Sequence, residues 1–182
     1  MGLTSSGKSF QAELIANKLN LKHICGSSLL LEKLNQDDSS KEHWWFTEKG
    51  VHIDAQRDKS KIDEDIDNTL LGIAEKQDNF IMESWTVPFL YQGNDAIKIY
   101  LNPPAESRIK MALASKEDKS LKDTEILKGI NNKDLTSMKR FKELYDIDIF
   151  STNGFDIIMD NSLLKPSQTH EILISFINQV KK

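Results

Sequence analysis

Gly2-Leu3-Thr4-Ser5-Ser6-Gly7-Lys8-Ser9 is the stretch that decides the fold of this chain. It matches the pattern G-x-x-x-x-G-K-[ST], whose glycines allow a tight turn with backbone N–H groups pointing inward at phosphate oxygens. The following residues, 9–19, have the apolar spacing of a helix with Phe10, Leu14, Ile15 and Leu19 on one face. The positive end of that helix dipole faces the same anion. The stretch therefore predicts a phosphate-binding loop.

The loop and the residue after it supply the expected nucleotide contacts. Lys8 is expected to reach the β- and γ-phosphates and to act in catalysis, and the Ser9 hydroxyl is a hard-oxygen ligand suited to Mg²⁺. ATP and Mg²⁺ are therefore the expected cofactors. The predicted nucleotide-binding residues in this region are Gly2, Thr4, Ser5, Ser6, Gly7, Lys8, Ser9 and Phe10.

Composition limits the class of protein. The chain has 182 residues, 38% hydrophobic and 29% charged, which predicts one globular domain over 1–182. Its net charge of −4 argues against a duplex nucleic-acid surface. No apolar run approaches the roughly 20 residues of a membrane span, and no signal peptide precedes the first motif. With the single cysteine Cys25, these features predict a cytoplasmic protein, and we expect a monomer or weak homodimer.

Strand and helix patterns alternate along the chain. Strands are predicted at 22–25, 80–83, 96–101 and 155–159, and helices at 9–19, 29–34, 62–76, 104–114, 127–145 and 172–180. On the 127–145 helix, Leu127, Ile130, Met138, Phe141 and Tyr145 form the predicted apolar stripe. Residues 35–60 are polar apart from Trp44-Trp45-Phe46 and are expected to form an insert. The alternation predicts an α/β sandwich with a parallel sheet covered on both faces.

The start of the chain conflicts with this fold. A phosphate-binding loop of this kind follows a hydrophobic strand inside the sheet, yet only Met1 precedes Gly2. Two explanations remain open: the sequence begins late, or the sheet is built differently. We favour the first, in which the first strand is absent from the sequence.

Several downstream segments resemble the nucleoside monophosphate kinases, most closely the compact archaeal-type cytidylate kinases. The segments, which follow in order from Gly2 almost to the last helix, are Ile62-Asp63-Glu64-Asp65-Ile66-Asp67, Phe80-Ile81-Met82-Glu83, Ile97-Lys98-Ile99-Tyr100-Leu101 with Pro104 and Arg108, and Lys139-Arg140-Phe141-Lys142-Glu143-Leu144-Tyr145-Asp146-Ile147-Asp148. The last resembles that family's Arg-Tyr-x-x-x-Tyr-Gly-Ile-Asp pattern. The resemblance implies a P-loop kinase-type three-layer sandwich with an acceptor-binding insert at 35–76 and a short lid at 115–123.

The implied activity is transfer of the γ-phosphoryl group of ATP to a nucleoside monophosphate, and CMP or dCMP is the favoured acceptor. Four departures keep other interpretations open. Glu83-Ser84-Trp85 stands where the family usually has Glu-Gly-Arg, and Lys133-Asp134 where it has Arg-Glu. The lid has Lys116 near the place where the family usually has arginine, and Leu29-Leu30-Leu31 stands where an arginine is common. Lysine cannot reproduce the bidentate fork of arginine on phosphate. The alternatives are another small acceptor, or a non-catalytic nucleotide-binding regulatory protein.

Two further residues are predicted to act in catalysis. Phosphoryl transfer depends mainly on positioning and on positive charge around the transferring group. Arg140 is our candidate for clamping the phosphates, against the alternative of a solvated helix charge. Glu83 ends a buried strand at the edge where ligands bind, so it is expected to hold Mg²⁺ through water or to orient the acceptor; an ion-paired acid is the alternative. Lys116, with Lys119, is the predicted lid cation on ATP.

Four more residues, with Arg140, are predicted to contact the acceptor. Asp63 and Asp67 lie four apart on one helical face and are expected to contact its base or sugar, unless they only stabilise a helix N-terminus. Arg108 follows the Pro-Pro turn and either binds a phosphate or forms a surface salt bridge. Trp85 is predicted to offer a stacking surface in place of the missing arginine.

Overall fold

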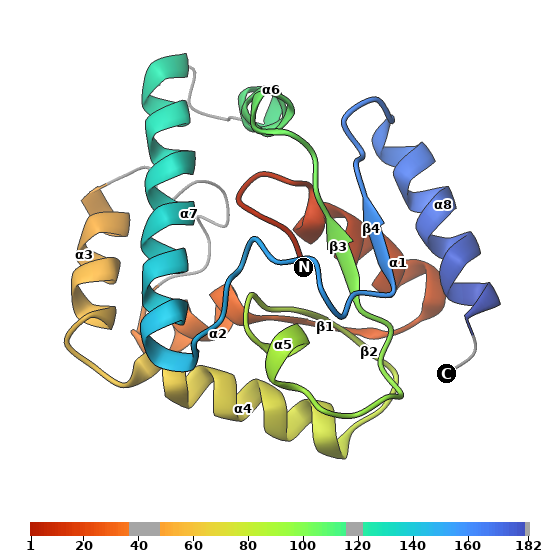
Figure 1. Cartoon of the computed structure of the whole chain (residues 1–182), viewed down its shortest axis with the longest axis horizontal. Helices are drawn as coiled ribbons and strands as arrows, with labels where there is room; N and C mark the ends of the chain where they lie inside the picture. Colours follow the sequence, from red (N-terminus) through yellow and green to blue (C-terminus); the bar gives the residue numbers. More distant parts are fainter. Residues whose placement is uncertain (37–47, 116–121, 181–182) are drawn as a thin grey trace.

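A computed structural model describes residues 1–36, 48–115 and 122–180 of the chain (Figure 1). Trp44, Trp45, Phe46, Lys116 and Lys119 lie outside the described residues, as does most of the predicted lid. The described helices and strands are α1 (Lys8–Leu19), β1 (Lys22–Cys25), α2 (Gly26–Lys33), α3 (Glu48–Arg57), α4 (Ile62–Lys76), β2 (Phe80–Glu83), α5 (Val87–Leu90), β3 (Ile99–Leu101), α6 (Ala105–Ser115), α7 (Asp123–Tyr145), β4 (Ile157–Met159) and α8 (Pro166–Gln179).

All described strand pairs are parallel. β1 pairs with β2 so that Cys25 lies opposite Glu83, and β3 pairs with β4. The start of the chain runs along β3, because Leu101 N donates to Met1 O at 2.9 Å and Gly2 forms a parallel bridge with Leu101. The parallel α/β fold is therefore confirmed.

Between β2 and β3, the described part of the chain contains no pairing strand. A cavity of about 350 Å³ lies there instead, and its apolar lining includes Ile81, Ile99, Leu101, Ile15 and Ile177. Met1 also lines this cavity, and its N-terminal ammonium donates to Ile99 O at 2.6 Å. That the sequence begins late stays a prediction.

Helices cover both faces of the strands, as the alternation of side chains on β2 shows. Phe80 and Met82 pack into a core with α2 and α4, whereas Ile81 points to the opposite face and packs with α1 and α8. The three-layer arrangement follows from this alternation, because successive side chains of a strand face opposite ways. No helix in the described ranges has the length and apolar character needed to span a membrane.

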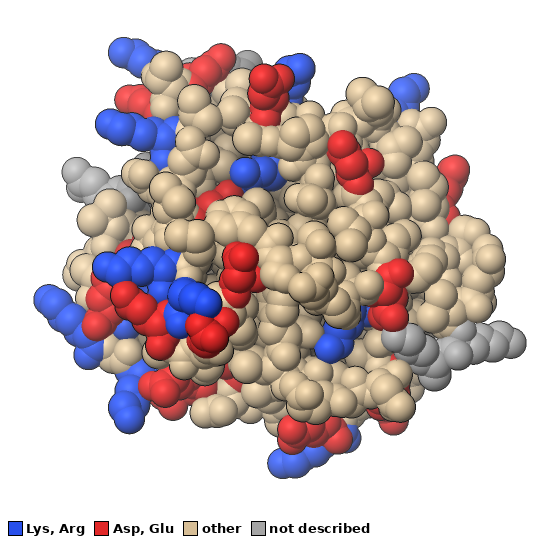
Figure 2. All heavy atoms as spheres, viewed as in Figure 1, with Lys and Arg blue, Asp and Glu red and all other residues tan. Residues whose placement is uncertain are grey.

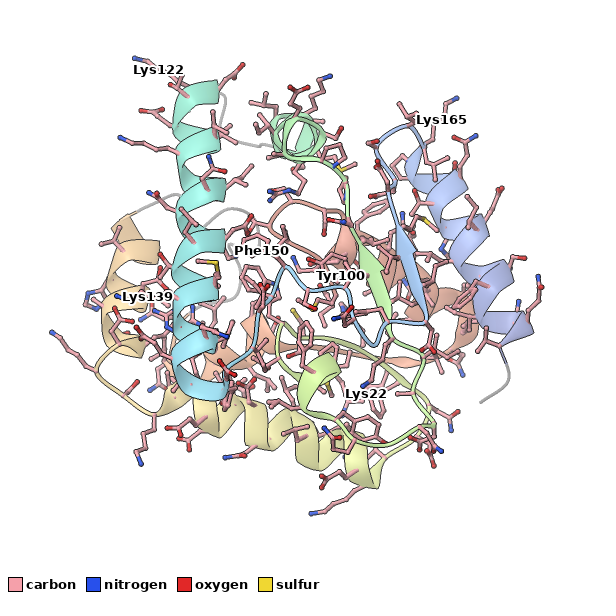
Figure 3. The ribbon with its side chains drawn as sticks, in the orientation of Figure 1. Lys22, Tyr100, Lys122, Lys139, Phe150 and Lys165 are labelled. Carbon is pink, nitrogen blue, oxygen red and sulfur yellow. The ribbon has the colours of Figure 1, made fainter. Side chains whose placement is uncertain are left out.

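The carboxyl-terminal half is fixed to the sheet by Tyr100 of β3, whose side chain lies in the interior (Figure 3). Its hydroxyl donates to Ile149 O at 3.0 Å, and burial raises the pKa of that hydroxyl to about 12. The segment after α7 is thereby held against β3.

Two sequence predictions are wrong in detail, and one helix was not predicted. Phe10 is 54% exposed because the buried face of α1 is set by Gln11, Ala12, Ile15 and Ala16 instead. On α7, Leu127 is exposed, and the neighbouring Ile126 packs with Ala112 of α6. Within the insert, residues 48–57 form the helix α3, which is anchored by the fully buried Ile53. One buried apolar residue in a polar segment gives too weak a periodicity for the helix to be predicted from the sequence.

Gly2 lies where no side chain fits. A Cβ there would come within 2.4 Å of Ser6 Oγ and 2.7 Å of Leu101 O, so Gly2→Ala forces the loop or β3 to move. We expect Gly2→Ala to lower the free energy of unfolding by about 1–3 kcal/mol, the usual cost of overpacking. Chemical denaturation measures this change.

Gly72 in α4 provides the control, because nothing lies within 4 Å of the position of its added Cβ. Gly72→Ala should raise stability by about 0.5–1 kcal/mol, since alanine is the better helix former. Equal effects of the two substitutions would contradict the close approach at Gly2.

Candidate active site

The phosphate-binding loop takes a left-handed backbone at two points. Ser5 has φ 60° and Gly7 has φ 82°, and α1 begins at the next residue, Lys8. Gly7 provides no side-chain cap for the first N–H groups of α1. Those N–H groups are therefore available for an anion at the helix N-terminus, whereas Thr4 N and Ser6 N of the loop already donate to Asp134 Oδ1 and Leu3 O.

Protein groups brace the loop on its buried side. Asp134 of α7 accepts a hydrogen bond from Thr4 N at 3.0 Å and pairs with Arg108 of α6 at 2.6 Å. The same Arg108 Nη1 donates to Thr4 O at 2.9 Å, and Asn161 Nδ2 donates to Ser6 O at 3.2 Å. Elements distant in sequence thus fix the loop backbone in place.

A carboxylate faces the end of the loop. Glu83 accepts from Ser9 Oγ at 2.7 Å through Oε2, and its Oε1 lies 2.8 Å from His23 Nε2. Burial alone would raise the pKa of Glu83, but the His23 hydrogen bond, the Lys8 charge and the Ser9 hydrogen bond together lower it below its ordinary value. Glu83 is therefore ionised at neutral pH.

A cavity of about 850 Å³ surrounds the loop. On the β4 side it is lined by Phe10, Lys110, Met111, Asn161 and Leu163; on the β1 and β2 side it is lined by Ser27, Arg57, Asp63, Asp67, Trp85 and Thr86. The loop residues Thr4 to Ser9 and Glu83 lie between these two ends. The cavity therefore has room on both sides of one phosphate site.

Two arginines and three aspartates form an ion-pair cluster at the α3 end of the cavity. Arg57 of α3 pairs with Asp63 at 2.8 Å and with Asp54 at 3.2 Å. Arg140 of α7 contacts Asp58 at 2.7 Å, and Asp54 and Asp63 at 3.4 Å each. On the face shown in Figure 2, acidic and basic side chains are similarly interspersed. The cluster ties α3 to α4 and α7.

Asp67 and Trp85 form another part of the wall. Thr86 Oγ1 donates to Asp67 Oδ1 at 2.5 Å, yet burial raises the pKa of Asp67 above its ordinary value. The Trp85 ring packs edge-on against Phe141 at 6.3 Å, and Lys8 Nζ lies 5.9 Å from its centroid. Both side chains are thus preplaced beside the phosphate loop.

Lys133 of α7 adds a cation to the cavity lining. Burial, followed by the nearby charges of Lys8 and Arg57, lowers the pKa of Lys133 to about 7, against the opposing effect of Asp134. Lys8, Arg57 and Lys133 all line the cavity, and basic side chains around the loop suit an anionic ligand such as phosphate.

Most of the predicted site residues meet in this cavity. Lys8, Ser9, Glu83, Asp63, Asp67 and Trp85 all line it. Arg108 and Arg140 do not belong to its lining: Arg108 is paired with Asp134 behind the loop, and Arg140 with the aspartates of the cluster. Lys116 lies outside the described residues.

Several contributors to the site were not predicted from the sequence, among them His23, Arg57, Asp134 and Asn161. Asn161 had a usable signal, since it lies just beyond the end of a predicted strand, where ligands gather in α/β sheets. His23, the second residue of the strand predicted at 22–25, had no such signal. Arg57 and Asp134 had none, because charged helix residues are usually solvated.

A phosphate-binding loop at a helix N-terminus, facing a strand-end carboxylate within a parallel α/β sandwich, is typical of P-loop nucleotide-binding proteins. The family model described as the cytidylate kinase-like family matches residues 2–163. The chain therefore belongs to that family and is a kinase that uses nucleotides.

Curated relatives are similar to this chain over nearly its full length. A cytidylate kinase from Methanosarcina mazei is 30% identical over 173 residues, covering 94% of this chain and 91% of that protein. One from Methanocaldococcus jannaschii is 28% identical, covering 100% and 97%. One from Sulfolobus acidocaldarius is 27% identical, covering 98% and 92%.

Solved structures share the fold at low identity. A shikimate kinase from Bacteroides thetaiotaomicron has a TM-score of 0.61 at 14% identity, covering 99% of this chain and 96% of that one. An uncharacterized protein from Eubacterium ventriosum has a TM-score of 0.66 at 13% identity, covering 98% and 96%. These structures support the P-loop architecture.

The brace behind the loop leads to a stability prediction. Arg108→Met should lower the free energy of unfolding by about 3–5 kcal/mol, because Asp134 is then left as an unpaired buried charge. Thermal or chemical denaturation measures the loss. Lys139→Met, which removes the exposed pair with Glu143, should cause a far smaller change. A small effect at Arg108 would show that the pair does not brace the loop.

Proposed function

We propose that this kinase transfers the γ-phosphoryl group of ATP to CMP or dCMP, giving ADP and the cytidine diphosphate. The observation that supports it most is the single cavity with its phosphate loop between two ends, one for each nucleotide. The names of the relatives support a cytidine acceptor. Holding donor and acceptor on either side of one loop brings the reacting atoms together, which is the main contribution a protein makes to this reaction.

The β4 end of the cavity is the proposed donor site. Amides of the loop and of the first turn of α1 hold the triphosphate, with Lys8 reaching its outer phosphates. Phe10 is 54% and Leu163 is 96% exposed, and both line this end. Large apolar side chains left open at a cavity edge offer packing surface for an adenine ring.

Ser9 and Glu83 fit a magnesium ion, because hydroxyl and carboxylate oxygens are the ligands it prefers. When bound, the ion would neutralise charge on the phosphates. Ser9 would hold it directly, since its proton is directed at Glu83 and its lone pairs remain available. Glu83 would hold it through water while keeping Ser9 oriented.

The β1 and β2 end is the proposed acceptor site. Asp67 lines this end of the cavity, and burial raises its pKa although Thr86 and Tyr145 both interact with its carboxylate, so it is placed to contact a base or sugar. Asp63 is held by Arg57 at the same wall. Arg140 can clamp phosphates only by exchanging its aspartate partners for phosphate, and that role stays a prediction. We propose that Arg108 positions the loop rather than touching the acceptor.

A panel assay tests the activity directly. ADP release with CMP, dCMP, UMP, AMP, GMP and shikimate should be greatest with the cytidine nucleotides and should require Mg²⁺. Lys8→Ala should lower the rate by a factor of about 10² or more, as expected for loss of a group that stabilises transition-state charge. Turnover confined to a different acceptor identifies that acceptor, and ATP binding without turnover favours the regulatory alternative.

The wall formed by Trp85 gives a prediction about the acceptor. Trp85→Ala should weaken acceptor binding about ten-fold, because aromatic stacking on a base is worth about 1–3 kcal/mol, and should change ATP affinity much less. Trp85→Phe retains a ring and is the matched control. Equal losses for both nucleotides on Trp85→Ala would contradict stacking on the acceptor.

Lys133 gives a pH prediction. With a pKa of about 7, Lys133 is largely charged at pH 6 and largely neutral at pH 8.5. Its positive charge favours an anionic acceptor, so affinity for the acceptor should fall as pH rises through this range. Lys133→Arg, which stays charged throughout, should flatten the profile above pH 7. If acceptor affinity depends on pH in the same way for wild type and Lys133→Arg, a group other than Lys133 is responsible for the pH dependence.

A further inference from the structure

His23 lies next to the proposed magnesium site without lining the cavity. Its Nε2 is 2.8 Å from Glu83 Oε1, and the other oxygen of Glu83 accepts from Ser9 at 2.7 Å. The lining residues of the cavity include Glu83 and Ser9, but not His23. Among the described residues, His23 therefore contacts the site through the carboxylate.

The strand register explains how the three side chains meet. In the parallel pair β1–β2, Cys25 is opposite Glu83 and His23 is opposite Ile81. Side chains two apart on a strand share a face, so His23 and Glu83 are diagonal neighbours on one face of the pair. Helix α1 packs on β1 and β2 and brings Ser9 to the carboxylate.

The carboxylate needs both of these donors. Glu83 is only 7% exposed, and a buried carboxylate is stable only when its oxygens are hydrogen-bonded. Because an ionised carboxylate only accepts, His23 Nε2 carries a proton and donates it to Oε1. Ser9 and His23 hold different oxygens, so together they fix both the position and the rotation of the carboxylate plane.

We infer that His23 is a positioning residue that fixes Glu83, and through Glu83 the Ser9 hydroxyl, for binding of the magnesium–nucleotide complex. This inference rests on the proposed function, because it takes Ser9 and Glu83 as the magnesium-binding pair. It adds a donor outside the cavity that, within the part of the chain that the structure describes, contacts the site at one carboxylate oxygen. Loss of a partner that orients a metal-binding group commonly lowers metal affinity about 10–100-fold.

Nucleotide binding with and without magnesium tests the inference in the intact chain. Isothermal titration measures the affinity for a non-hydrolysable ATP analogue in excess Mg²⁺ and in EDTA. His23→Met fills a similar volume without a donor, and it should weaken binding about ten-fold in Mg²⁺ while leaving binding in EDTA unchanged. His23→Gln can place an N–H near the same oxygen and should restore most of the loss.

A double-mutant cycle separates positioning from general damage. Glu83→Gln should itself weaken Mg²⁺-dependent binding, and adding His23→Met to it should cost nothing more, because His23 acts only through Glu83. Additive losses would overturn the inference, as would wild-type binding by His23→Met or an equal loss in EDTA. Thermal melting without nucleotide shows whether each variant is folded. If His23→Met does not fold, the comparison of His23→Gln with His23→Leu tests the inference in its place.

The failure of this inference is distinguishable from failure of the proposed function. If Glu83→Gln loses Mg²⁺-dependent binding and His23→Met does not, His23 has no positioning role and the kinase site stands. If wild-type protein shows no difference between Mg²⁺ and EDTA, the proposed magnesium pair is itself wrong, and the inference falls with it.

Discussion

Close approach of backbone amides to a phosphate group is the constraint on which the rest of this structure depends. An amide can reach the anion only if the loop is tight and is held open without a ligand. Groups outside the loop meet both conditions. The buried pair Arg108–Asp134 forms hydrogen bonds with the backbone of Thr4, and Asn161 donates a hydrogen bond to Ser6 O. A site prepared in this way needs little reorganisation when the phosphate arrives, which is the basis of electrostatic catalysis.

Charge is distributed around that loop in a consistent way. Cations inside the cavity, Lys8 and Lys133, lie where phosphates are expected, whereas the acidic side chains at the α3 end are neutralised by Arg57 and Arg140. Glu83 is the exception, because it stays ionised beside the loop through its donors. A carboxylate at this point attracts a divalent cation, and a divalent cation accompanies the phosphates of ATP in phosphoryl transfer.

Much of the fold was predictable because its determinants are local. The loop motif, the helix at 62–76 and the strands at 22–25 and 80–83 are set by short-range spacing, and the structure places them at those bounds. In contrast, the bracing role of Arg108 and the pairing of Arg140 depend on which charges the fold brings together. The spacing of residues in the sequence does not indicate such long-range pairs. The apolar spacing of 9–19 also predicted Phe10 on the buried face of α1, whereas Phe10 is exposed.

The most direct test of the central claim is a crystal structure with Mg²⁺ and a non-hydrolysable ATP analogue. The account predicts that the triphosphate is enclosed by the backbone amides between Thr4 and Ser9, with Lys8 at its outer phosphates and the metal between Ser9 and the phosphate oxygens. Density for the analogue elsewhere, or a loop closed against Trp85 with no room for a phosphate, would contradict it.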